Sequence, residues 1–307
     1  MKPTTFWKNF QLGEELSISG VFIYNGMRRF HEMQNLNHTE EVFEFLYNLS
    51  VGFERLLKIA VVLLEHNDGI KQEELEKSLI THNHLELLRR LKKHVTINLN
   101  TPHNDLLSLL GTFYKSLRYD RFSLSSVYDS NKEMGAICDI LSKHLKTDIQ
   151  HGNTIFGTKN EDKYRKFIRK TVLTISRTIF EVVKEQAMAL NIYTYELRSG
   201  SKAETVFLRE VNISDEDILW KELLVFFMNT KTTSGYLEFL REITPLDFDP
   251  ALVDEYLDCF QSDTAKAMVM DELEHHYQEL EETGKRFELM NIVGAHNVSF
   301  DYPDDEE

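Results

Sequence analysis

The residues of this chain best suited to chemistry lie in one short segment, residues 146–153, with the sequence KTDIQHGN. Lys146 and His151 stand five positions apart in it, and Gly152 and Asn153 predict a turn directly after the histidine. An imidazole with a pKa of about 6.5 can move the proton of a 2'-hydroxyl, and a fixed cation can hold a phosphate. Hydrolysis of RNA without a metal needs about these two groups, so we expect a candidate site in this segment.

Two other positions compete with this segment or add to it. Residues 89–94 (RRLKKH) also place a cation before His94, but they end an early helix and no glycine follows, so we expect a solvated helix end. His144 lies just before Lys146 and is either a second polar member of the site or a residue with a core or surface role.

A long helix is predicted after the segment, over residues 161–190, because apolar residues recur there at steps of three and four. Its opposite face carries cations, which at about 100° per residue fall within about 60° of arc. They are Lys163, Lys166, Lys170, Arg177 and Lys184. Ordinary solvation is one interpretation of this face, and RNA binding, favoured by the nearby His151, is the other. Arg118 and Arg121, near another predicted helix end, suit either phosphate contact or the helix dipole.

The elements that must position these residues are mostly helices. Apolar spacing predicts further helices over residues 39–66, 72–79, 84–93, 105–119 and 130–146, then over 220–228, 236–242, 251–260 and 264–282. Alternation of Tyr193, Tyr195 and Leu197 with polar residues, before a Ser-Gly-Ser turn, predicts a β-hairpin. We therefore expect an N-terminal extension (1–38), a helical domain (39–190), a β-hairpin or linker (191–213), an acidic helical domain (214–300) and a disordered tail (301–307).

Length and composition exclude several classes of protein. The 307 residues suffice for about two domains with a substantial core. The two cysteines, Cys138 and Cys259, lack metal-ligand spacing, so we expect neither a disulfide framework nor a zinc ribbon. The start of the chain has no signal-peptide pattern, and no apolar run approaches a membrane span. We expect a cytoplasmic protein that does not contact a membrane.

The net charge of −15 is unevenly distributed along the chain. Residues 214–307 hold 6 Lys and Arg against 24 Asp and Glu, whereas residues 143–202 hold 12 basic residues against 6 acidic ones. Phosphate binding depends on local cation density, so the overall acidity does not exclude RNA. The acidic part serves solubility, inhibits the basic face or binds a basic partner protein.

Three segments together resemble a known superfamily. They are residues 52–58 (GFERLLK) in the first long helix, residues 81–88 (THNHLELL) at the start of a later one, and residues 146–153 before the last. In this order and spacing, residues 39–190 resemble the HEPN superfamily. The resemblance implies an all-α bundle that forms a homodimer and acts, without metal or cofactor, as an endoribonuclease in phage defence or toxin–antitoxin systems.

The catalytic signature of that superfamily is an arginine, a polar residue and, after about four to six intervening positions, a histidine. Carried over to this chain, His151 is the histidine, Thr147 the polar residue and Lys146 replaces the arginine, while Asn153 would help to bind RNA. A guanidinium grips a phosphate with two parallel hydrogen bonds, whereas an ammonium is a flexible point charge. The resemblance therefore leaves two expectations, a ribonuclease or a catalytically inactive subunit that binds RNA or a partner protein.

Overall fold

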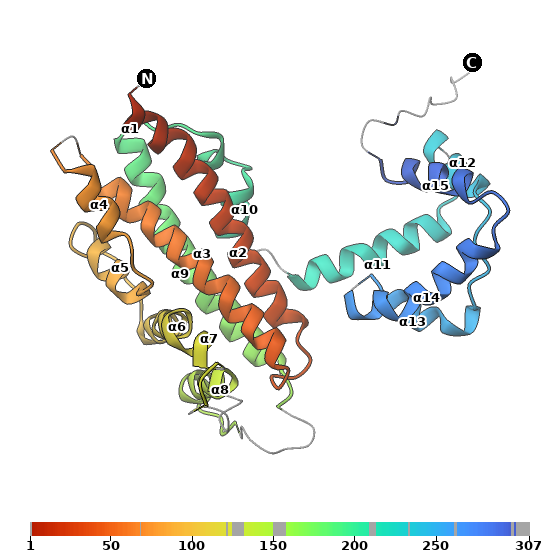
Figure 1. Cartoon of the computed structure of the whole chain (residues 1–307), viewed down its shortest axis with the longest axis horizontal. Helices are drawn as coiled ribbons and strands as arrows, with labels where there is room; N and C mark the ends of the chain where they lie inside the picture. The colour runs from red at the N-terminus through yellow and green to blue at the C-terminus, as the bar shows by residue number, and fades with distance from the viewer. Residues whose placement is uncertain are drawn as a thin grey trace. The chain divides into compact units, whose positions relative to one another are not determined.

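The computed structural model of the chain describes residues 2–67, 69–120, 122–124, 132–149, 158–208, 213–232, 234–260, 263–295 and 298. The chain divides into two units, residues 1–213 and 214–307, which we describe separately (Figure 1). Within the described ranges both units are helical, in agreement with the mainly α class expected from the sequence. The one β-contact in these ranges is an isolated antiparallel bridge between Asn35 and Lys159.

The first unit is a bundle around three long helices. Its elements are α1 (Pro3–Phe6), η1 (Trp7–Gln11), α2 (Leu12–Glu32), α3 (Thr39–Glu65), α4 (Gln72–Ser78), α5 (His84–Leu91), α6 (Thr101–Thr112), η2 (Phe113–Leu117), α7 (Arg118–Asp120), α8 (Lys132–Leu145), α9 (Asp162–Ala189), η4 (Tyr195–Leu197) and α10 (Lys202–Leu208). The long helices α2, α3 and α9 run side by side (Figure 1). The helices predicted over residues 39–66 and 161–190 are confirmed as α3 and α9.

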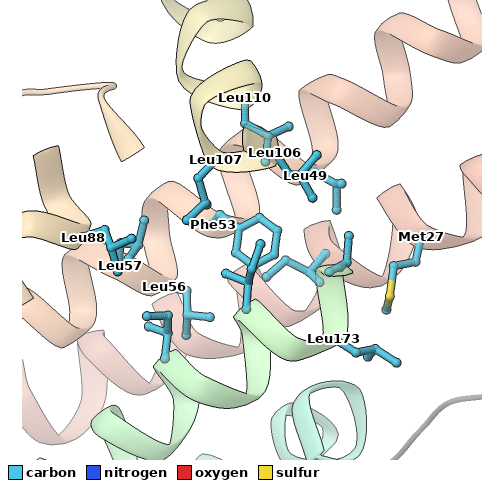
Figure 2. Packing of buried hydrophobic residues seen from close by; sticks show 14 of the residues in the cluster. Met27, Leu49, Phe53, Leu56, Leu57, Leu88, Leu106, Leu107, Leu110 and Leu173 are labelled. Carbon is cyan, nitrogen blue, oxygen red and sulfur yellow. The ribbon is translucent and has the colours of Figure 1, made fainter. Parts of the chain in front are cut away.

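Helix α3 lies at the centre of this bundle, in contact with α2, α5, α6, α8 and α9. Its Phe53, Leu56 and Leu57 are fully buried, and Leu88 of α5 and Leu107 of α6 belong to the same core (Figure 2). Burial of one such side chain stabilises the fold by about 1.5–3 kcal/mol. Because neighbours surround it, α3 is apolar over most of its circumference.

Helix α2, which the sequence did not predict, packs along α3 through small residues. A Cβ on Gly26 would lie 2.7 Å from Leu49 Cδ2, and one on Gly52 would lie 2.6 Å from Ile23 Cγ1. The two backbones therefore approach closely at both positions. The hydroxyl of Ser19 donates to the Gly52 carbonyl at 2.8 Å, which fixes the crossing with a buried hydrogen bond.

The start of α9 is fastened to the end of α2 by a buried asparagine. Asn160 is fully buried, and its Nδ2 donates to the carbonyls of Phe30 at 2.7 Å and Met33 at 3.1 Å. The backbone N–H of Leu36 also donates to the Thr158 carbonyl at 2.8 Å. The two bonds from Asn160 satisfy carbonyls at the end of α2, and together with the Leu36 bond they fix where α9 begins.

The β-hairpin expected over residues 191–213 was wrong for the described part of that range. Within residues 192–208 the chain forms the 3-10 turn η4 (Tyr195–Leu197) and the helix α10 (Lys202–Leu208). Tyr193 and Tyr195 are each 69% exposed, so their alternation with polar residues did not mark a buried strand face. Ser201 instead begins a helix, because its Oγ accepts from Glu204 N at 3.0 Å and the Glu204 carboxylate accepts from Gly200 N at 2.6 Å.

The second unit consists of α11 (Ile213–Asn229), α12 (Gly235–Glu242), η5 (Pro250–Leu252), α13 (Val253–Asp258), α14 (Asp263–Glu279) and α15 (Thr283–Ile292). None of its described side chains is buried, and aromatic pairs such as Trp220 with Phe260, 5.5 Å between ring centroids, hold its helices together. Helix α15 was not expected, and the tail over residues 301–307 lies outside the described residues. No described helix in either unit has the length and apolarity to cross a membrane.

Candidate functional site

The predicted cation Lys146 lies directly after the C-terminus of α8. Its φ of 52° is in the left-handed region, where a residue with a Cβ costs about 1–2 kcal/mol relative to glycine. Lys146 is exposed, and the Thr147 hydroxyl donates to the Leu145 carbonyl at 3.3 Å. A strained backbone here turns the chain sharply out of α8 and holds Lys146 at the surface.

An aspartate and a histidine meet beside this turn. His144, with 11% of its side chain exposed, donates from Nε2 to Asp105 Oδ2 at 2.8 Å, and Lys143 Nζ donates to the same oxygen at 2.6 Å. Burial alone would raise the pKa of Asp105, but the hydrogen bonds from Lys143 and His144 outweigh it and lower that pKa. The carboxylate is therefore ionised at neutral pH and orients the imidazole, leaving Nδ1 of His144 for other chemistry.

The ring of His144 is also held by packing. It stacks on Phe167 of α9, with 5.8 Å between centroids and 20° between planes. The site is thus built from three helices: α6 supplies Asp105, α8 supplies Lys143 and His144, and α9 supplies the aromatic face.

A second histidine lies in the first turn of α6. Asn100 and His103 form a capping box, in which His103 Nδ1 accepts from the Asn100 backbone N–H at 3.0 Å. The proton of the neutral ring is therefore on Nε2. Burial, with a smaller contribution from Lys170, lowers the pKa of His103, so it is neutral at pH 7.

The predicted cations of α9 differ in their surroundings. Lys163, Lys166 and Lys170 are all exposed, as expected for a solvated or phosphate-binding face. Lys163 Nζ pairs with Glu161 at 2.9 Å, so its charge is partly offset. Lys170 is close enough to act on the pKa of His103, which places it near the first turn of α6.

Arg118 is not brought together with Lys146. Its guanidinium lies over the ring of Tyr114, 3.7 Å from the centroid, and 4.6 Å from the ring centre of Tyr119. Arg118 and Asp120 both belong to α7, and Asp120 pairs at 3.3 Å with Lys132 in the first turn of α8. Lys146 follows the last turn of that helix, whose 14 residues at 1.5 Å each place its backbone roughly 20 Å from that of Lys132.

The other predicted site residues, His151, Asn153 and Arg121, lie outside the described residues, so their roles stay predictions. The alternative segment at residues 89–94 is engaged elsewhere. Arg90 binds the Glu65 carboxylate with two bonds, of 3.0 and 2.5 Å, and His94 lies 3.7 Å from it.

Asp105 and His103 were missed by sequence reasoning. Asp105 stands 39 positions before its partner His144, on a different helix, so no local spacing reveals the pair. Among the described residues, no group of three or more His, Cys, Asp or Glu side chains is arranged to hold a metal ion. In comparisons with known proteins, no family model, no curated protein and no solved structure matches this chain.

Proposed function

We propose that the first unit is a HEPN-like RNA-binding domain that cleaves RNA without a metal ion. The observation that carries the proposal is the Asp105–His144 hydrogen bond of 2.8 Å, with Lys143 on the same carboxylate and Lys146 at the adjoining turn. An oriented imidazole beside several cations is what general acid–base catalysis on a phosphodiester requires. The fold class and the resemblance of residues 39–190 to the HEPN superfamily add support.

In the proposed reaction His151 takes the proton of the 2'-hydroxyl, as the resemblance implies. The 2'-oxygen then attacks the adjacent phosphorus while the bond to the 5'-oxygen breaks. His144, whose Nε2 stays bonded to Asp105, donates a proton from Nδ1 to that leaving oxygen. Lys146 neutralises the phosphate, and Thr147 or Asn153 orients it. The products are a 2',3'-cyclic phosphate and a 5'-hydroxyl.

We propose further that the site is completed by dimerisation, as the resemblance implies, with two copies of residues 146–151 facing each other. The exposed face of α9, with Lys166 and Lys170, would extend the site along the RNA backbone. Each phosphate contact releases condensed counterions, so binding should weaken as salt rises.

A second candidate function is a catalytically inactive subunit that binds RNA or a partner protein in a defence assembly. The lysine at the position of the family arginine favours it, because a single ammonium cannot make the bidentate contact of a guanidinium. The charge of the second unit, 24 acidic residues against 6 basic ones, suits a basic partner protein.

One experiment separates the two functions. The full chain, its His151→Ala and Lys146→Arg variants, and a His275→Ala control in the second unit are incubated with mixed RNA in chelator. Fragment ends and molar mass are measured together. The ribonuclease is supported if the unaltered chain produces cyclic phosphate ends and His151→Ala, still a dimer, does not. Faster cleavage by Lys146→Arg would identify Lys146 as a weakened form of the family arginine. Salt-sensitive binding without cleavage supports the inactive subunit.

A further inference from the structure

A pocket on the first unit lies away from the proposed RNA site. It has a volume of about 260 Å³ and is lined by η1, α2, α3, the end of α4 and η2. Trp7, Leu12, Val51 and Ile59 contribute its apolar wall. Drug-sized ligands occupy roughly 300–1,000 Å³ with similar walls and a few polar groups, so this pocket fits a smaller molecule.

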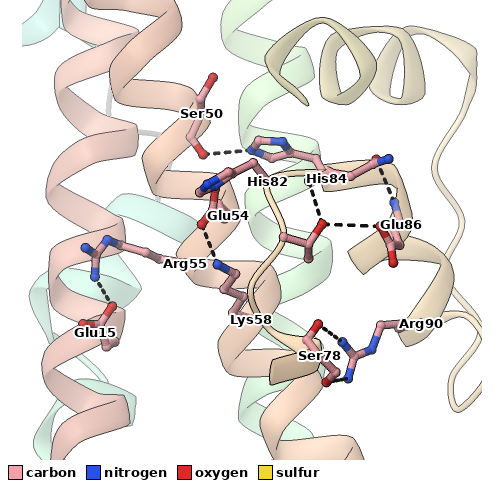
Figure 3. A network of polar contacts seen from close by, with 12 residues as sticks. Glu15, Ser50, Glu54, Arg55, Lys58, Ser78, His82, His84, Glu86 and Arg90 are labelled. Atoms are coloured by element: carbon pink, nitrogen blue, oxygen red, sulfur yellow. Dashed lines mark hydrogen bonds and ion pairs between the residues drawn. The ribbon is translucent and has the colours of Figure 1, made fainter. Parts of the chain in front are cut away.

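The polar side of the pocket carries two acids and two bases. Glu54, 12% exposed, accepts from Lys58 Nζ at 2.6 Å and from His82 Nδ1 at 2.8 Å, and Arg55 Nη1 pairs with Glu15 of α2 (Figure 3). Residues 54, 55 and 58 share one edge of α3 because residues three and four apart are neighbours on a helix. The four charged residues that line the pocket therefore sum to zero.

Several donors here have bonding capacity that the described residues do not use. Arg55 uses one of its five N–H groups, through Nη1, and Lys58 uses one of three. Neither the Tyr114 hydroxyl nor the Trp7 indole N–H has a hydrogen-bond partner among the described residues, although both side chains line the pocket. Both side chains are only half-buried and their polar atoms reach solvent, so a ligand bound in the pocket can form hydrogen bonds with them.

We propose that this pocket binds a small zwitterion with an apolar side chain, of the size of free leucine or phenylalanine. A ligand with one net charge would meet a repelling partner in either ion pair. A zwitterion places its carboxylate against Arg55 and Lys58 and its ammonium against Glu15 and Glu54, and its side chain packs on the apolar wall. The proposal stands on this pocket alone and does not depend on RNA cleavage.

Calorimetric titration of the full chain tests the proposal. L-leucine and L-phenylalanine should give saturable binding. Glycine, which lacks the apolar side chain, N-acetyl-phenylalanine, which lacks the ammonium, and phenylalanine amide, which lacks the carboxylate, should each bind at least tenfold more weakly. Equal binding of either blocked analogue, or no binding of any zwitterion at millimolar concentration, would overturn the proposal. These ligand comparisons use the unaltered chain, so they do not depend on the folding of a variant.

Variants then locate the site. Arg55→Met and Glu15→Gln should each weaken phenylalanine binding at least tenfold. Arg28→Met, which removes a comparable α2 ion pair with Glu32 outside the pocket, should leave it unchanged. Thermal melting of each variant checks that it folds. Unchanged binding in folded Arg55→Met and Glu15→Gln would place the ligand elsewhere and refute the assignment.

Discussion

Replacing Gly52 by alanine should separate α2 from α3. The added Cβ would lie 2.6 Å from Ile23 Cγ1, 3.0 Å from Ile23 N and 3.2 Å from Phe22 Cβ. A side-chain atom alone could move aside, but the backbone nitrogen cannot unless the helix moves. Movement of α2 would also lengthen the bond from Ser19 to the Gly52 carbonyl, now 2.8 Å.

The expected loss follows from three contributions. Overpacking costs about 1–3 kcal/mol, and a lost buried hydrogen bond costs about 1 kcal/mol more. Alanine is better than glycine within a helix by about 1 kcal/mol, which offsets part of this. The net loss is about 2 kcal/mol, which in a unit of this size lowers Tm by roughly 4–8 °C.

Thermal denaturation followed by circular dichroism measures this loss, with Gly20→Ala as the matched control. A Cβ on Gly20 in α2 would lie 3.7 Å from the Phe207 ring, an ordinary contact, so the control should melt at or slightly above the unaltered chain. If Gly52→Ala melted as high as Gly20→Ala, the close crossing of α2 and α3 would be refuted.

Two further predictions concern stability. Asn160→Ala leaves the Phe30 carbonyl without its buried donor, whereas the Met33 carbonyl keeps its bond from Arg165 Nη2 at 2.8 Å, so the change should cost about 1–3 kcal/mol in urea denaturation; a loss under about 0.5 kcal/mol would contradict this role. The hydrogen bond from Arg90 lowers the pKa of Glu65 in the folded protein below its ordinary value of 4.5. The ionised carboxylate therefore stabilises the fold above the pKa that Glu65 has in the unfolded chain, and this stabilisation is lost as the pH falls through its pKa in the folded protein. Below about pH 4.5 the free energy of unfolding of the unaltered chain should therefore fall more steeply with pH than that of Glu65→Gln. Equal slopes for the two proteins in this pH range would contradict the role of the Arg90–Glu65 pair.

The sequence predicted the long helices best. Helices α3 and α9 carry apolar residues at helical spacing over more than seven turns, so their signal is strong. Helix α2 was missed because Ser19, Gly20 and Gly26 weaken helix propensity at the positions that let it approach its neighbours. The same small residues that hide the helix in the sequence position it in the fold.

The errors elsewhere have local causes. Alternation of exposed tyrosines imitated a strand over residues 192–198, and the Ser201 to Glu204 capping pattern, which marks a helix start, was overlooked. For the candidate site, the sequence identified the cations and indicated His144 as one of its possible members. It could not identify Asp105 as the partner of His144, because that contact joins two helices and is set by tertiary packing.

The proposed role of His144 as general acid is tested most directly with an RNA whose leaving 5'-oxygen is replaced by sulfur. A thiolate leaves without protonation, so it needs no general acid. In single-turnover cleavage in chelator, His144→Ala should cleave ordinary RNA about 10²–10⁴-fold more slowly than the unaltered chain and cleave the sulfur-containing RNA at nearly the unaltered rate. His151→Ala should be slow on both substrates. Full activity of His144→Ala on ordinary RNA, or equal impairment on both substrates, would contradict the account.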